Sequence, residues 1–154
     1  MTIDDVLKET DNTTFAIALS NLVFPRYDRD GFQALTGPEQ VAYCVDALER
    51  EVNNGGFDQF FANSSGDTAQ ETVKALETIG ARAAAGIVRR AIAMFPDGEP
   101  AVDRDERADQ LDAAGEERDG LWDSLDQEFY SYPDDLPALL RRYVEAHHAE
   151  FRKW

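Results

Sequence analysis

The strongest constraint on the fold is an acidic segment in the second half of the chain. Residues 97–135 contain fifteen Asp and Glu residues and three arginines, a net charge of −12 within 39 residues. The whole chain of 154 residues has a net charge of −16. About three quarters of the surplus negative charge therefore lies in one quarter of the sequence.

The spacing of the acids in this segment predicts an α-helix. Seven of them follow one another at intervals of 4, 3, 4, 3, 4 and 3 residues, which places them on one face of a helix. They are Asp105, Asp109, Asp112, Glu116, Asp119, Asp123 and Asp126. An apolar set lies one position earlier each time and so faces about 100° away. It comprises Ala108, Leu111, Trp122 and Leu125.

Such a row of like charges destabilises the helix that carries it. Each like-charge pair one turn apart costs about 0.2–0.5 kcal/mol, so the six steps together cost about 1–3 kcal/mol. Because nothing local offsets this cost, the row indicates a function. We predict that these seven acids bind a partner, and that the flanking Asp103, Glu106 and Glu117 belong to the same binding surface. Gly115 and Gly120 leave open whether residues 103–130 form one bent helix or two.

The rest of the chain also has helical periodicity, with no convincing strand pattern. A first helix is expected over residues 14–24, ending at Pro25. Thr36, Pro38 and Glu39 form an N-terminal capping signature for a second helix that ends at about Val52.

After that helix the sequence Asn53-Asn54-Gly55-Gly56 predicts a break, followed by a short aromatic helix to about Asn63. Asp67 or Thr68 is expected to cap the next helix, and another covers residues 82–95. Asp134 or Asp135 should cap a last helix over residues 136–152. These patterns predict an all-α fold, with residues 1–154 forming a single compact domain of six to eight helices.

Composition excludes several classes of partner and location. A net charge of −16 argues against direct binding to nucleic acid or to an anionic membrane, and favours basic partners. The first residues are acidic where a signal peptide needs basic ones, and the longest apolar run is too short to cross a bilayer. The single cysteine, Cys44, fits a reducing compartment, so a cytoplasmic location is expected.

The sequence contains no recognisable catalytic or metal-binding motif. His147 and His148 are adjacent and point about 100° apart on a helix, so they do not form a metal-ligand pair. Cys44 lies on an apolar helix face, where a cysteine usually packs as a small hydrophobe. No P-loop, Gly-rich dinucleotide-binding loop, nucleophile elbow or zinc-protease motif is present. We therefore predict no catalytic residues, no cofactor, no metal and no enzyme activity.

One stretch resembles a known family. The sequence EREVNNGGFDQFFANSSG at residues 49–66, followed by ALETIGA at 75–81, is similar to the hallmark of a bacterial all-helical domain-of-unknown-function family. The resemblance covers about residues 36–145. It implies a compact helical fold and, from the characterised member, a homodimeric DNA mimic. That mimic's surface carboxylates imitate DNA phosphates, occupy the DNA-binding surface of a transcription factor and thereby regulate transcription.

Three interpretations of the charge remain open. In the first, the chain is a DNA mimic that binds a basic DNA-binding protein, such as a transcription factor, and blocks its DNA site, with homodimerisation left open. In the second, the acids keep the protein soluble or suit a halophilic proteome. In the third, the chain binds a small molecule or is an enzyme, with a pocket near the Asn53–Gly56 turn.

Overall fold

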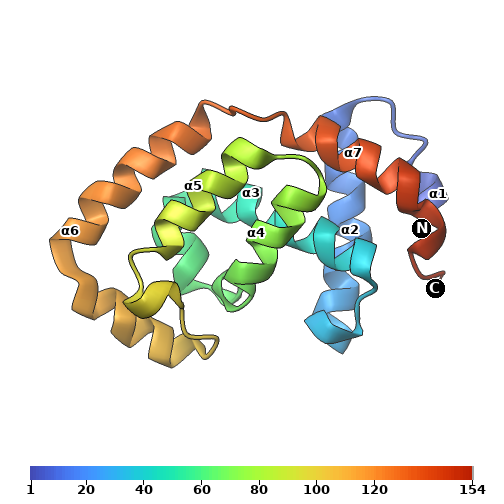
Figure 1. Cartoon of the computed structure of the whole chain (residues 1–154). Helices are drawn as coiled ribbons and strands as arrows, with labels where there is room; N and C mark the ends of the chain where they lie inside the picture. Colours follow the sequence, from blue (N-terminus) through green and yellow to red (C-terminus); the bar gives the residue numbers. More distant parts are fainter. Residues whose placement is uncertain (154) are drawn as a thin grey trace.

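The computed structural model describes residues 1–153, and these form helices and connections without any strand (Figure 1). The α-helices are α1 (Ile3–Val6), α2 (Asn12–Asp30), α3 (Gly37–Ala62), α4 (Ala69–Thr78), α5 (Arg82–Ile92), α6 (Arg104–Tyr130) and α7 (Leu136–His147). Short 3-10 turns are η1 (Phe32–Ala34), η2 (Ser64–Thr68), η3 (Pro96–Gly98) and η4 (His148–Glu150). The predicted all-α fold of six to eight helices is confirmed.

Helix α3 is the centre of the fold. It contacts α2, α4, α6, α7 and η2, and its buried residues span the whole length of the helix. Its start is the predicted capping box, in which Thr36 Oγ1 accepts from the Glu39 N–H and Glu39 accepts from the Thr36 N–H. Cys44 is buried on its apolar face, as predicted.

The break predicted for Asn53-Asn54-Gly55-Gly56 is present, and it lies at the two glycines. Gly55 and Gly56 have non-helical backbone angles, and Gly56 has a φ of 70° and a ψ of −170°. Helical geometry resumes at Phe57 and ends at Ala62, next to the expected Asn63. Phe57, Phe60 and Phe61 are fully buried, so they fill the core and do not line a pocket.

The prediction that α2 stops at Pro25 is wrong, because the helix continues to Asp30. A proline inside a helix costs about 3 kcal/mol, so tertiary contacts must hold the last turn in place. Arg26 is buried there and donates to Glu39 at 2.9 Å, while the Tyr27 ring stacks on Tyr43 at 4.2 Å. Neither contact is visible as a local sequence pattern.

Other ends differ from the expected ones by a few residues. α4 begins after Thr68, although the Thr68 side chain makes no capping hydrogen bond. α5 ends at Ile92 and α7 at His147, both before the expected ends at 95 and 152. Asp135 caps α7 by accepting from the Ala138 N–H at 3.2 Å, as predicted.

No helix among residues 1–153 is long and apolar enough to cross a membrane. α6 lies along one side of the molecule and curves around the α3–α5 part of the fold (Figure 1). The two chain ends lie together on the opposite side, near α1 and the end of α7 (Figure 1).

Candidate acidic interaction surface

α6 is one helical element with a sharp break at Gly115. This glycine has a φ of 65° and a ψ of −152°, a conformation that residues with a Cβ atom rarely adopt. We call residues 104–114 the first limb and residues 116–130 the second limb. The prediction that all seven regularly spaced acids share one face is therefore wrong, because α6 is bent at Gly115 and carries two shorter rows.

The first limb is attached to the core through a buried arginine. Arg107 is fully buried and donates to the carbonyl oxygens of Phe61 at 2.6 Å and Asn63 at 2.8 Å. It also forms an ion pair with Asp67 at 2.8 Å. Because these acceptors lie at the end of α3 and in η2, Arg107 holds the start of α6 against them. Ala108, predicted to be buried, is exposed.

The second limb is attached through its aromatic side. Trp122 is buried, stacks on Phe61 at 4.9 Å and donates from its indole N–H to the Ala91 carbonyl at 3.2 Å. Leu125 and Phe129 are buried on the same limb, in agreement with the predicted apolar face. Arg107 therefore anchors the first limb and Trp122 the second, and the acids of each limb face away from its anchor.

Arg118 connects the two limbs. Its guanidinium donates to the Leu111 carbonyl at 2.5 Å on the first limb, and it pairs with Asp119 at 2.7 Å on its own limb. The same group lies 3.5 Å from Asp58, in the last turns of α3. Asp58 is exposed and so adds a carboxylate to the second limb's surface.

The predicted partner-binding residues divide into two groups. Nine are exposed, and seven of these form no ion pair within 4.0 Å and no side-chain hydrogen bond among the described residues. The seven are Asp105, Glu106, Asp109, Asp112, Glu116, Glu117 and Asp123. We call them the free acidic set.

The remaining three acids have contacts within the fold. Asp103 caps α6 by accepting from the Glu106 N–H at 2.9 Å, and Asp119 pairs with Arg118. Asp126 is half-buried and accepts from the Phe57 N–H at 2.9 Å. It thus satisfies a donor that the break at Gly56 leaves without a helical partner.

Carboxylates of the second limb and Asp58 affect one another's protonation. Burial raises the pKa of Asp126, against the lowering effect of its hydrogen bond from Phe57, and the nearby Asp123 and Asp58 raise it further. Burial also raises the pKa of Asp58, with Asp119 and Asp123 adding to the effect and Arg118 opposing it. The second limb and the end of α3 therefore contribute carboxylates to the same region of the surface.

Sequence reasoning did not identify Asp58 as part of this surface. Other acids outside α6 lie elsewhere: Asp46 and Glu49 line a cleft on another side of α3, and Glu77 pairs with Arg89. Asp58 directly follows the Gly55–Gly56 break and Phe57, and only the path of the chain after that break brings it to α6. Helical spacing alone contains no signal for it.

The geometry of the hallmark sequence explains why it is distinctive. Glu51 accepts from Gln59 at 2.9 Å and from Asn63 at 2.8 Å, and so bridges the two sides of the break. The sequence model of the DMP19-like protein family matches residues 33–147. The chain belongs to this family. No curated protein and no solved structure shows a significant match to the chain.

The DMP19-like family is a DNA mimic protein family and not a known enzyme family. The resemblance expected from the hallmark residues is thereby confirmed. Among the described residues no group of three or more potential ligands could hold a metal ion. Membership of the family agrees with a surface that presents carboxylates.

Proposed function

We propose that this chain binds a basic DNA-binding protein, such as a transcription factor, through the free acidic set of α6 and blocks its DNA site. The observation that supports this most strongly is that seven carboxylates on α6 are exposed and unpaired in a chain of a DNA mimic family. In this proposal the seven carboxylates take the place of the phosphates of the target's DNA.

The dimensions of the two limbs suit this role better than one straight row would. Asp105 to Asp112 and Glu116 to Asp123 each extend about 11 Å along their limb, at about 1.5 Å per residue. A DNA strand presents phosphates about every 3.4 Å along the axis and follows a curved path. We propose that the two short rows, joined at the Gly115 bend, approximate such a curved path.

Competition with DNA tests this proposal. A fluorescently labelled duplex is bound to each of a panel of basic DNA-binding proteins, and the pure chain is added at 50 mM NaCl while anisotropy is recorded. We expect displacement from at least one protein, and weaker displacement at 200 mM NaCl because exposed charges are screened. A chain that displaces DNA from none of them at low salt would contradict the proposal.

A charge-matched pair of variants locates the contact. The triple variant Asp109→Asn, Asp112→Asn, Glu116→Gln removes three members of the free acidic set. Exposed ion pairs contribute about 0.5 kcal/mol each, so we expect about tenfold weaker displacement and a shallower salt dependence. The control Asp4→Asn, Glu9→Gln, Asp28→Asn removes the same number of exposed acids in and near α1 and α2. Equal effects of the two variants would show that only net charge matters.

A further inference from the structure

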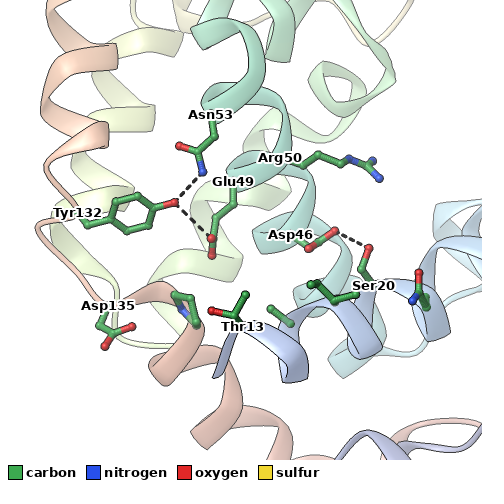
Figure 2. Close-up of a pocket in the computed structure, with 12 residues that line it drawn as sticks. Thr13, Ser20, Asp46, Glu49, Arg50, Asn53, Tyr132 and Asp135 are labelled. Atoms are coloured by element: carbon green, nitrogen blue, oxygen red, sulfur yellow. Dashed lines mark hydrogen bonds between the residues drawn. The ribbon is translucent and has the colours of Figure 1, made fainter. Parts of the chain in front are cut away.

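A second feature lies away from the α6 surface. An open cleft of about 750 Å³ is formed by α2, α3 and the connection between α6 and α7 (Figure 2). Its volume falls within the about 300–1,000 Å³ that is usual for small-molecule sites. The cleft begins near Asn53, the first residue of the turn at which a pocket is expected from the sequence, but it lies on the side of the preceding α3 turns.

Three carboxylates line this cleft. Asp46 and Glu49 are half-buried and lie one turn apart on α3, and Asp135 comes from the α6–α7 connection. Asp46 accepts from Ser20 at 3.0 Å, and Glu49 accepts from the Tyr132 hydroxyl at 3.5 Å. Among residues 1–153, no ion pair within 4.0 Å neutralises any of the three carboxylates.

The one cationic side chain in the lining, Arg50, forms no ion pair with these three carboxylates. The Arg50 guanidinium lies 3.8 Å above the Phe24 ring and 3.9 Å from Glu51. Figure 2 shows Arg50 directed away from Glu49, while Glu49 extends into the cleft between Tyr132 and Thr13. The cleft therefore keeps a local excess of negative charge.

This excess affects protonation. Burial, which has the largest effect, and the neighbouring Asp46 and Asp135 together raise the pKa of Glu49 to about 7, against the lowering effect of the hydrogen bond from Tyr132. Burial likewise raises the pKa of Asp46, which Ser20 and Arg50 lower. The α2 side of the cleft contributes no ionisable group. A cation in the cleft would favour the ionised form of Glu49.

The cleft also has an apolar part. Ile17 leaves 57% of its surface exposed, although it lies in the middle of α2, and Ala16 and Pro137 line the cleft beside it. A ligand that suits both parts has a positive group and a hydrocarbon chain.

We propose that this cleft binds a small organic cation of the aliphatic amine class, with its ammonium group between Asp46 and Glu49 and its carbon chain over Ile17. Half-buried carboxylates without a cationic partner supply the charge recognition, and the exposed isoleucine supplies the apolar contact. The site does not include the free acidic set, so it is independent of the proposed DNA mimicry.

Calorimetric titration with pentylamine at pH 8 and 150 mM NaCl tests the site. We expect saturable one-to-one binding, and none with 1-pentanol, which has the carbon chain without the charge. The variant Asp46→Asn, Glu49→Gln should weaken binding at least tenfold, whereas the α6 variant Asp109→Asn, Glu116→Gln should change it less than twofold. Equal weakening by both variants would overturn the proposal, because it would show diffuse attraction to a negative protein.

Two further measurements distinguish a defined amine site from general attraction of cations. At pH 6 Glu49 is mostly protonated, so we expect binding about tenfold weaker than at pH 8. The variant Ile17→Arg places a cation in the cleft and should abolish pentylamine binding while leaving thermal stability unchanged. Affinity that is the same at both pH values, or binding of a lysine-containing peptide without binding of pentylamine, would overturn the proposal.

Discussion

At the scale of single residues, the break at Gly55–Gly56 determines the most. A Cβ atom at Gly56 would lie 2.3 Å from Asp126 Oδ2, and its φ of 70° already favours glycine. Asp126 lies there because its other oxygen accepts from the Phe57 N–H. One glycine, one carboxylate and one backbone donor thus join α3 to the second limb of α6.

Replacing this glycine should therefore weaken the whole fold. We expect Gly56→Ala to lower the free energy of unfolding by about 1–3 kcal/mol, because it strains the backbone and displaces Asp126. Urea denaturation followed by circular dichroism measures the change. The control Gly86→Ala lies within α5 with no atom near its added Cβ, and should raise stability by about 0.5–1 kcal/mol. Equal stability of Gly56→Ala and the wild type would contradict this account.

The chemical types of these residues were readable from the sequence, but their roles were not. Asn53 to Gly56 predicted a break, and the spacing of Asp126 placed it among the exposed acids. The structure shows that Asp126 instead accepts a hydrogen bond from the Phe57 N–H at the break. Phe57 is 69 residues away from Asp126 in the chain. Contacts at such separation leave no trace in helical periodicity, and for the same reason Arg107 was not predicted to be buried.

At the scale of helices, caps and apolar faces were predictable, whereas ends and bends depended on tertiary contacts. The Thr36 and Asp135 caps are local patterns and are confirmed. The length of α2 is not local, since Arg26 and Tyr27 continue the helix past Pro25 through contacts with α3. Gly115 and Gly120 left open whether this segment forms one bent helix or two, and the structure shows one element with a break at Gly115.

The bend at Gly115 leads to a prediction about both stability and binding. The added methyl of Gly115→Ala meets no atom within 4 Å, so its effect comes from backbone conformation alone. We expect unfolding free energy to fall by about 1–3 kcal/mol, and DNA displacement to weaken because the two limbs change their angle.

A glycine on the same helix provides the control for this change. Gly120→Ala also meets no atom within 4 Å, but Gly120 lies in regular helix, so stability should rise slightly and displacement should stay the same. Urea denaturation and the anisotropy competition measure the two effects. If Gly115→Ala displaced DNA as well as Gly120→Ala does, the bend would have no part in binding.

At the scale of the whole molecule, the response of stability to salt distinguishes the proposed DNA mimicry from a halophilic surface. The net charge of −16 makes the compact state repel itself, and moderate salt screens this repulsion. Residues of all seven α-helices contribute to the buried apolar core, which does not depend on salt for its formation. We therefore expect the protein to be folded at low ionic strength.

Thermal unfolding at increasing salt tests this expectation. Raising NaCl from 10 to 200 mM should increase the melting temperature by about 2–4 °C, the shift that about 1 kcal/mol produces in a domain of this size. Little further gain is expected above 200 mM, because the Debye length is by then already short. A protein that is unfolded at 10 mM and gains stability up to molar NaCl would instead fit a halophilic surface.

The two anchors of α6 fix the orientation of its two limbs relative to each other. Arg107 fastens one limb to η2 and the end of α3, and Trp122 fastens the other against Phe61 and Phe95. The angle between the two carboxylate rows is therefore set by contacts inside the protein. Exchange of an interior side chain such as Phe95 would therefore alter the angle between the two rows while every acidic residue on the outside stays in place.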